Sequence, residues 1–394
     1  MVNISFTGDL MCSPRMTERS KEDYSASFRK AIKLKHCDYL VGNLETPIAG
    51  EALEYTHERY CFNTPSSFLT ALKDCGFQLL TLANNHCMDR GEEGILRTLL
   101  PSVHAMVVGK DRGEEGILRT LENCKSGGFE TIGVYSDRES RDALFVKEIN
   151  GIKIAFINYT YGTNAFAHHR FLEHPYMVNL TQPEETLPGS IHLLNRYDKI
   201  AEDVERIYLG QTEEFSAVKP YLEQLRRDIE RAKAAADYVI MILHSGSQYV
   251  EEVDPYSRFL AEKIKEYGAD IIVGHHQHII QACDSKDDFL KVFCLGNFMC
   301  DRYIQGEDYY FDAPQFNAVL HLSLEKRADG GIDAKKSFSI YTTAKNELGL
   351  PSAIDSYDVY KKTNATFLKE QILRYANLFA GDRKYEKVQE RYEL

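Results

Sequence analysis

The chain has 394 residues, 43% of them hydrophobic, and carries a formal net charge of −12 from 47 basic and 59 acidic side chains. This length and composition allow a large buried core. Because no cluster of Lys and Arg interrupts the acidic balance, the sequence argues against nucleic-acid binding. It leaves an anionic substrate open, since metal ions or a few local arginines can hold one.

The N-terminus predicts a short strand rather than a signal peptide, because no charged segment and no long apolar segment precede Asp9. No run of about 18 apolar residues occurs, so we expect no transmembrane segment. The nine cysteines are scattered and form no Cys-x-x-Cys pair, a pattern typical of reduced thiols. We therefore expect a soluble, cytoplasmic protein.

Apolar runs that end in polar or glycine-rich residues predict buried strands. These runs are residues 2–7, 38–41, 77–83, 153–158, 238–243, 271–273 and 291–295. Helical patterns separate several of them, at residues 65–75, 217–236 and 256–267. The alternation of strand and helix predicts a layered α/β fold.

Two pairs of runs predict hairpins. Residues 146–149 and 153–158 flank Asn150-Gly151, the sequence preferred by type I′ turns. Residues 317–325 and 336–343 are separated by a segment with two consecutive glycines. Antiparallel pairs beside the parallel alternation predict two packed mixed sheets flanked by helices.

From residue 357 onward the chain is charged and helical in pattern. Its apolar stripe is predicted to be Phe367, Ile372, Leu373 and Leu378, which favours one or two docked C-terminal helices. We therefore expect a main domain over residues 1–350 and a helical extension over residues 351–394.

Residues 89–99 are repeated identically at 111–121, 22 positions later. Because solenoids need at least three repeats, a local tandem duplication is the better interpretation. Only one copy can continue from Asn84-Asn85-His86 as a single amphipathic helix, and the sequence does not decide which. The surplus residues are predicted to bulge out as an insertion, at little cost in loop-closure entropy.

The strongest chemical signal is Gly274-His275-His276-Gln277-His278, directly after a predicted strand. On an extended backbone His276 and His278 would share one face, and two imidazoles on one face are typical ligands of a transition metal. His275 would then point the other way, towards a supporting role. A histidine-rich surface loop is the alternative interpretation.

Four other predicted strands also end in polar residues, namely Asp9, Glu45, Asn84-Asn85-His86 and His244. Carboxylate and amide oxygens ligate hard cations, and a histidine can protonate a leaving group. Asp9, Glu45 and His244 taken singly are more often helix caps or hydrogen-bonded loop residues. For Asn84-Asn85-His86, an Asn turn with a capping histidine is an equal alternative. Gathered at one sheet edge, all these residues predict a metal-assisted hydrolytic site.

Six motifs over about residues 1–300 resemble, in the same order, those of the CapA family of poly-gamma-glutamate biosynthesis proteins. They are Gly8-Asp9-Leu10-Met11, Gly42-Asn43-Leu44-Glu45-Thr46-Pro47, Ala83-Asn84-Asn85-His86, His244-Ser245-Gly246, Gly274-His275-His276-Gln277-His278 and Gly296-Asn297-Phe298. That family is similar in fold to calcineurin-like metallophosphatases. The resemblance therefore implies a four-layer α/β/β/α sandwich of two mixed sheets.

The resemblance also implies roles for single residues. One or two divalent ions, Mn, Fe or Zn, would be held by Asp9, Glu45, Asn85, His244, His276 and His278. The implied catalytic residues are His86 as proton donor, Asn85 and His275, and the implied substrate-binding residues are Asn43, Asn84, Tyr161 and Asn297. Core packing is the alternative for Tyr161. The chain departs from metallophosphatases at Met11, where they have histidine, and at Glu45, where they have aspartate.

The implied function is a hydrolase-type step in capsule biosynthesis on a polyanionic or glutamate-containing polymer or peptide, within a capsule-synthesis complex. Two alternatives stay open. One is a metal-dependent phosphoesterase with an unrelated substrate, and the other is a non-catalytic assembly factor of a polymer synthase. Fold analogy alone does not choose among them.

Overall fold

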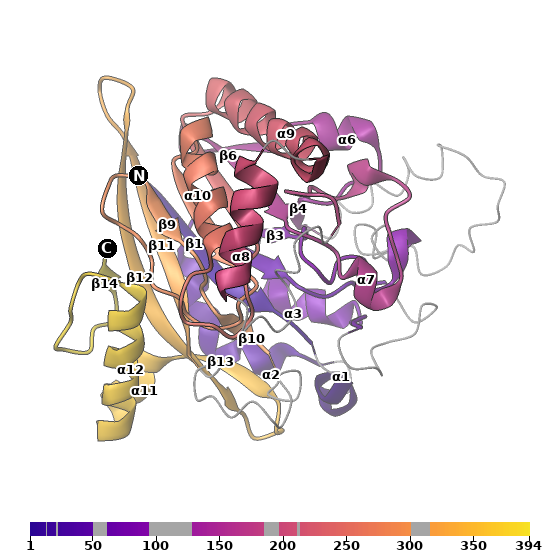
Figure 1. Cartoon of the computed structure of the whole chain (residues 1–394). Coiled ribbons are helices and arrows are strands. Elements are labelled where there is room, and N and C mark those ends of the chain that lie inside the picture. Colours follow the sequence, from indigo (N-terminus) through magenta and orange to yellow (C-terminus); the bar gives the residue numbers. More distant parts are fainter. Residues whose placement is uncertain are drawn as a thin grey trace.

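The computed structural model describes residues 1–12, 14–20, 23–49, 61–93, 128–184, 197–210, 213–300 and 316–394. Within this part, two β-sheets pack face to face and helices cover both outer faces (Figure 1). The predicted duplication and its insertion lie outside the described residues, apart from residues 89–93 at the start of the first copy.

The larger sheet has nine strands among the described residues. Its order is β13 (Pro351–Asp355), β12 (Ile332–Lys345), β11 (Phe316–Lys326), β1 (Val2–Leu10), β2 (Tyr39–Leu44), β3 (Leu79–Thr81) and β4 (Glu130–Ile132). Two short strands pair off this path, β10 (Asn297–Met299) with β1 and β14 (Tyr392–Glu393) with β12. Strands β1 to β4 are parallel, whereas β11, β12 and β13 are antiparallel to their neighbours.

The smaller sheet has five strands in the described part of the chain. Their order is β5 (Val146–Ile149), β6 (Ile152–Thr160), β7 (Tyr238–His244), β8 (Ile271–His275) and β9 (Leu290–Val292). Strands β6 to β9 are parallel, and β5 is antiparallel to β6. Both predicted hairpins are confirmed, β5–β6 and β11–β12. Asn150 (φ 48°) and Gly151 (φ 79°) both have the positive φ that a type I′ turn requires.

Alternate residues of the central strands divide between two environments, as the two-residue period of a strand requires. Ile4 and Phe6 of β1 share the apolar cluster between the sheets with Ile240 and Ile242 of β7. The intervening Met241 belongs instead to a cluster under the helices. Burying such a side chain completely contributes about 1.5–3 kcal/mol, so these clusters are the main source of stability.

Helices cover the outer face of each sheet. Over the larger sheet lie α1 (Pro14–Ser20), α2 (Ser25–Phe28), η1 (Arg29–His36) and α3 (Ser67–Cys75). Over the smaller sheet lie α8 (Tyr197–Val204), η5 (Glu205–Leu209), α9 (Glu213–Ala235) and α10 (Pro255–Tyr267), grouped on one side of Figure 1. The architecture is therefore the predicted α/β/β/α sandwich.

The three predicted helices form with bounds close to those expected, as α3, α9 and α10. Local sequence explains both ends of α10. Its N-cap Asp254 accepts a hydrogen bond from the Ser257 backbone N–H (2.9 Å), and Pro255 takes the first turn, where a missing N–H costs nothing. The helix stops at Gly268, whose φ of 103° is left-handed.

The C-terminal segment belongs to the same packed body. After β13 come α11 (Ser356–Thr363) and α12 (Thr366–Phe379), and then β14. Tyr375 of α12 stacks on Phe316 with ring centroids 4.8 Å apart, and Phe379 contacts Phe338 at 4.7 Å. These four rings belong to the apolar cluster between the sheets. The domain boundary after residue 350 stays a prediction.

The apolar stripe predicted for α12 is partly wrong. Ile372 is buried as expected, but Phe367 is 65% exposed. The buried face consists of Ile372, Tyr375, Ala376 and Phe379, the spacing of one side of a helix. Among the described helices, none combines the length and the apolarity that crossing a bilayer requires.

Between β4 and α8, the described residues form two further helices and a 3₁₀ turn. They are α6 (Arg138–Asp142), α7 (Ala165–His168) and η3 (Pro175–Met177). α6 is anchored by a capping box in which the Asp137 side chain accepts from the Ser140 backbone N–H at 2.7 Å. Among the described residues, β4 and β5 are the end strands of the larger and the smaller sheet.

Candidate metal centre and active site

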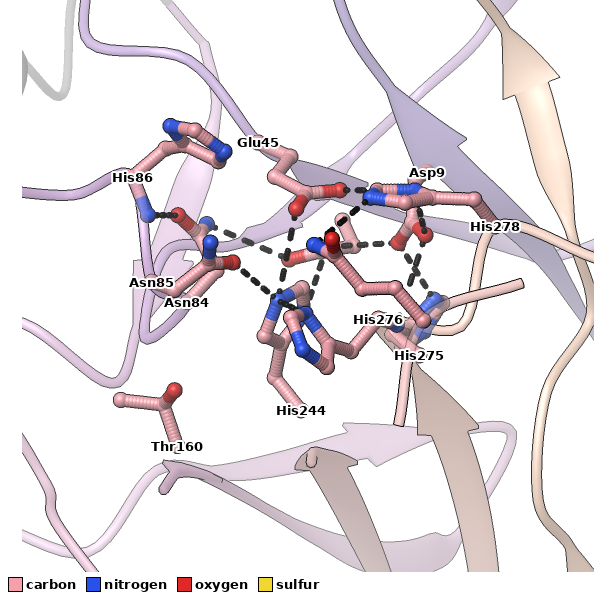
Figure 2. Close-up of polar contacts among 12 residues, drawn as sticks. Asp9, Glu45, Asn84, Asn85, His86, Thr160, His244, His275, His276 and His278 are labelled. Atoms are coloured by element: carbon pink, nitrogen blue, oxygen red, sulfur yellow. Dashed lines mark hydrogen bonds and ion pairs between the residues drawn. The ribbon is translucent and has the colours of Figure 1, made fainter. Parts of the chain in front are cut away.

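The candidate site lies where parallel strands of both sheets end. Asp9 is near the end of β1, Glu45 follows β2, His244 ends β7 and His275 ends β8. The carboxyl ends of parallel strands open on one edge of a sheet, where loops place reactive groups. Figure 2 shows these side chains directed towards one another, with Asn84, Asn85 and His86 entering from the loop after β3.

Two glycines allow the backbone to approach closely at this edge. A Cβ atom on Gly8 would lie 1.7 Å from the Gly296 carbonyl oxygen, and one on Gly274 would lie 2.0 Å from that of Phe293. Asp9 N–H donates to the same Gly296 oxygen at 3.0 Å. The glycine before each site residue therefore lets a neighbouring strand pack against it directly.

Asp9 is fully buried and is surrounded by donors. Its Oδ1 accepts from Asn43 Nδ2 at 2.8 Å and lies 3.1 Å from His275 Nδ1. Its Oδ2 lies 3.4 Å from His278 Nδ1. Burial on its own would raise the pKa of Asp9, but the hydrogen bonds and charges of His275 and His278 hold that pKa well below its usual range. Asp9 is therefore a carboxylate at neutral pH.

Glu45 is fully buried, and neither of its carboxylate oxygens has a hydrogen-bond partner among the described residues. Oε1 lies 3.4 Å from His244 Nε2, and Oε2 lies 3.8 Å from His278 Nδ1. Burial, reinforced by the negative charge of Asp9, raises the pKa of Glu45 to about 8. A buried carboxylate without donors is costly unless a cation compensates it.

His244 lies at the centre of the cluster. Its Nε2 lies 2.7 Å from Asn85 Oδ1 and 3.1 Å from His276 Nδ1, and its Nδ1 lies 3.3 Å from Asn43 Nδ2. Burial lowers the pKa of both His244 and His276 well below the ordinary histidine range. Both imidazoles are therefore neutral, the form that ligates metals.

The extended backbone expected for residues 275–278 is wrong. β8 ends at His275, and the next residues form a turn in which His276 (φ 104°) and His278 (φ 61°) have positive φ. Positive φ is unfavourable for histidine and needs support from its surroundings. Gln277 supplies it, because its Nε2 donates to the Ser245 carbonyl oxygen at 2.6 Å.

His275 at the end of β8 and His276 and His278 of the turn consequently all line the site. His278 Nδ1 lies 2.9 Å from Asn297 Oδ1, and although burial opposes it, the charges of Glu45 and Asp9 raise the pKa of His278 to about 9. His275 was expected to point away but contacts Asp9 instead. The turn, not strand alternation, brings His276 and His278 together.

His86 lies at the margin of the cluster. Its Nδ1 is 2.8 Å from Asp89 Oδ2, and the Phe62 ring packs against the imidazole with centroids 4.5 Å apart. Asn164 Nδ2 approaches the same Nδ1 at 3.5 Å and its Oδ1 accepts from Asn85 at 3.1 Å. The imidazole is thus held in one orientation next to the central donors.

Within the buried cluster, two groups of ligand atoms have the spacing of a metal site. Glu45, His276 and His278 form one group and Asp9, Glu45 and His244 the other, with the atoms of each group within 4.8 Å of one another. Glu45 belongs to both groups. Its unpartnered oxygens, together with the unpartnered Nε2 of His276, fit a divalent cation, because carboxylate oxygen and imidazole nitrogen are its usual donors.

The four predicted substrate-binding residues are all buried beside the cluster. Asn43 contacts Asp9 and His244, and Asn84 donates to the Leu44 carbonyl at 2.9 Å and accepts from His86 N–H at 3.1 Å. The Tyr161 ring lies 4.9 Å from that of His276. Asn297 accepts from His278. These contacts favour positioning of the cluster, and the predicted binding roles stay predictions.

Three side chains that hydrogen-bond an imidazole of the site were not among the predicted site residues, namely Asp89, Asn164 and Gln248. Gln248 Nε2 lies 3.4 Å from His278 Nε2. The spacing of His86 and Asp89 is a local signal that could have identified Asp89, since residues three apart on one turn are neighbours. Asn164 and Gln248 come from separate loops, and only tertiary packing brings them in.

Met11 occupies the position where metallophosphatases have histidine. Its side chain is buried against Phe62 and Cys300 in a small apolar cluster. A thioether there offers only a soft, weak donor. Met11 therefore offers no imidazole nitrogen on this side of the cluster.

Fold and site together define the chain as a metallophosphatase-like α/β/β/α protein with a buried, metal-capable cluster. Its sequence matches the family described as bacterial capsule synthesis protein PGA_cap over residues 3–102 and 109–302. The chain therefore belongs to this family.

Two curated relatives are similar in sequence. The capsule biosynthesis protein CapA of Bacillus anthracis is 25% identical over 308 residues, covering 76% of this chain and 60% of that protein. The PGA biosynthesis protein CapA of Bacillus subtilis (strain 168) is 24% identical over 308 residues, covering 77% of this chain and 64% of that protein. The chain thus spans less than two thirds of the length of either relative.

Among solved structures, a hypothetical protein from Thermus thermophilus is similar with a TM-score of 0.42 and 15% sequence identity. The match covers 86% of this chain and 99% of that chain.

Proposed function

We propose that the chain is a capsule-biosynthesis protein whose buried cluster is a divalent-metal site for a hydrolase-type reaction on a polyanionic or glutamate-containing substrate. The observation that carries the proposal is the unpartnered Glu45 carboxylate, which faces His244 and His278 in a fully buried setting. The ionised form of such a group is destabilising unless a cation occupies the site. The family and the names of its relatives suggest the substrate class.

The proposed ligands are Asp9, Glu45, Asn85, His244, His276 and His278. A divalent ion held there, Mn, Fe or Zn, would polarise the oxygen of the scissile carbonyl or phosphoryl group. Asn43 and His275 orient Asp9 through contacts at its Oδ1. Such outer contacts fix the direction of ligand atoms and strengthen binding.

His86 is the proposed proton donor. Asp89 accepts at Nδ1, so the second proton of a charged imidazole is on Nε2, the nitrogen that is left for a substrate. A positioned imidazole contributes about 10²–10⁴-fold to proton transfer to a leaving atom. The Phe62 ring and Asn164 restrict rotation of the His86 side chain and so keep Nε2 in place.

The test compares metal-loaded wild type with His86→Gln, Asp89→Asn and the double variant His276→Ala/His278→Ala. The substrates are poly-gamma-glutamate, a gamma-glutamyl dipeptide and nitrophenyl phosphate, and the exposed His36→Ala is the matched control. We expect turnover of a glutamyl substrate, a fall of about 10²-fold or more in H86Q, and full activity in His36→Ala.

Each other outcome identifies an alternative. Turnover of nitrophenyl phosphate alone would replace the proposal with a phosphoesterase. Absence of turnover on all three substrates, combined with co-purification with a polymer synthase, would favour a non-catalytic assembly factor. Unchanged turnover in H86Q would remove His86 from the reaction.

A further inference from the structure

A cavity outside the metal-capable cluster lies between strands of the two sheets and two helices. Its volume is about 200 Å³, and residues of β4, β6, α6 and α9 line it. None of the residues proposed above as ligands or catalytic groups is part of its lining. Nothing in the proposed hydrolytic reaction uses it.

One wall of the cavity is apolar. Ile132 of β4, Phe156 and Ile157 of β6, and the neighbouring Val134 and Phe145 form it. Phe145 and Phe156 pack against each other with ring centroids 6.1 Å apart. This wall suits an aromatic or branched aliphatic group, because ligand sites combine apolar walls with a few polar groups.

The lining also includes Arg141, whose side chain is only 10% exposed. Within the described residues its guanidinium donates through Nη2 alone, to Asp228 Oδ2 at 2.8 Å and to the Tyr159 hydroxyl at 3.1 Å. Among the described residues, no acceptor is hydrogen-bonded to the N–H groups of Nε and Nη1. Either N–H group can donate a charge-assisted hydrogen bond to a carboxylate oxygen.

Asp228 does not take up the remaining N–H groups of Arg141, because both of its carboxylate oxygens already accept other hydrogen bonds. Oδ2 accepts from Arg141 and from the Tyr159 hydroxyl (2.5 Å), and Oδ1 accepts from Gln224 Nε2 at 2.9 Å. Arg231 is a second cation in the lining. Two arginines against one aspartate leave an excess positive charge in a chain whose net charge is −12.

Asn179 completes the polar side. It is 3% exposed, and its Nδ2 donates to the Tyr135 hydroxyl and to the Asn158 carbonyl, both at 3.0 Å. Its Oδ1 has no partner among the described residues. A buried carbonyl oxygen without a donor costs free energy, so an acid that also carries an N–H or O–H group would gain a further hydrogen bond here.

We infer that this cavity is a binding site for a small carboxylate with an apolar body, such as an aromatic or branched-chain acid. Arg141 takes the carboxylate and the wall formed by Ile132, Phe145 and Phe156 takes the body. The size agrees, since an apolar cavity of about 150 Å³ accommodates benzene and this one is somewhat larger. The inference is independent of the hydrolytic function proposed above.

The test is calorimetric titration of the full chain with phenylacetate, with acetate and phenylethanol as probes that lack the body or the charge. We expect phenylacetate to bind about tenfold or more tighter than either, because a charge-assisted hydrogen bond and the apolar contact each contribute. Arg141→Met should weaken phenylacetate binding by about tenfold or more, whereas Arg138→Met, on the same short helix but outside the cavity, should not.

A second variant keeps the test decisive if R141M unfolds. Ala143→Phe places a ring at the exposed rim of the cavity, at a residue whose φ of −71° accepts any side chain, and should abolish binding with unchanged thermal stability. Absence of phenylacetate binding to wild type, equal binding of phenylethanol, or undiminished binding in A143F would each overturn the inference.

Discussion

The buried His321 and the buried histidines of the metal-capable cluster differ in what their ring nitrogens contact. His321 of β11 lies between two hydroxyls, with Nδ1 2.9 Å from Ser5 Oγ and Nε2 3.0 Å from Ser339 Oγ. At the strand ends, His276 has an unpartnered Nε2 and Glu45 has two unpartnered oxygens within the described part of the chain. His321 sits in regular antiparallel pairing, whereas His276 and His278 have positive φ.

The difference separates a structural histidine from a ligand cluster. His321 and the cluster are both removed from water, but only His321 regains its hydrogen bonds within the protein. The cluster keeps potential metal-ligand atoms directed towards one another, an arrangement that is unfavourable without a cation between them. Unsatisfied polar atoms and strained backbone together are therefore the stronger sign of function than burial of histidine itself.

The largest effect should come from removing two of the proposed ligands. His276→Ala/His278→Ala should weaken Mn²⁺ or Zn²⁺ binding by about 10⁴-fold, if each ligand contributes about as much as the upper range for supporting residues. Competition with a fluorescent chelator measures this. The distinction between His321 and the cluster would be wrong if His321→Gln weakened metal binding to the same extent.

The second prediction concerns acid. Burial, with a smaller effect of the Arg391 charge, lowers the pKa of His321 to about 3. The unfolded chain therefore binds this proton first as pH falls below the ordinary histidine pKa of 6.5, so stability present at neutral pH is lost on acidification. Between about pH 7 and pH 4.5 the loss from this residue is about 3 kcal/mol.

Urea unfolding of wild type and His321→Gln at the two pH values isolates this effect from other titrating groups. The wild-type free energy of unfolding should fall further than that of the variant, because glutamine keeps a hydrogen-bonding side chain without a titrating group. Parallel losses in the two proteins would contradict the assignment of His321 as a buried neutral histidine.

The third prediction concerns Glu45 in metal-free protein. Its pKa is raised to about 8, so it favours folding while protonated and loses that contribution as pH rises from the unfolded value of 4.5 through 8. Metal-free Glu45→Gln should therefore gain about 2 kcal/mol relative to wild type between about pH 6 and pH 7.5. Excess metal should reverse the order, since only wild type gains the stabilisation from binding, about 2.7 kcal/mol at a hundredfold excess over Kd.

The smallest effect is predicted for the duplicated segment. Deleting residues 100–121 should leave both His321 and the cluster intact, because a surface insertion costs little closure entropy. Thermal midpoint and metal content should match those of wild type. A marked fall in either would show that the second copy is needed for the fold or for the cluster.

Much of the fold could be predicted because its signals are local. The apolar runs predicted the parallel strands β1, β2, β3, β6, β7 and β8, and Asn150-Gly151 predicted the β5–β6 turn. Since parallel strands share a carboxyl edge, the polar residues after them could be grouped before any coordinates were known. The short strands β4, β10 and β14 lacked such signals, because pairing with longer neighbours defines them.

The site was less predictable where backbone geometry depends on distant contacts. The turn over residues 276–278 rests on Gln277 contacting Ser245, and His275 faces Asp9 because Gly274 lets β8 pack closely against the Phe293 carbonyl. Likewise, the buried face of α12 follows from the aromatic rings of β11 and β12. Sequence periodicity carries no information about such pairings.

The most direct test of the central claim is the metal content of tag-free protein, measured by mass spectrometry after incubation with Mn²⁺, Fe²⁺ and Zn²⁺ and removal of excess ion. We predict stoichiometric retention of at least one of these metals by wild type and by His36→Ala, and its loss in Glu45→Gln combined with His276→Ala. Wild type without bound metal, or equal retention in all three proteins, would contradict the assignment of this cluster as a metal centre.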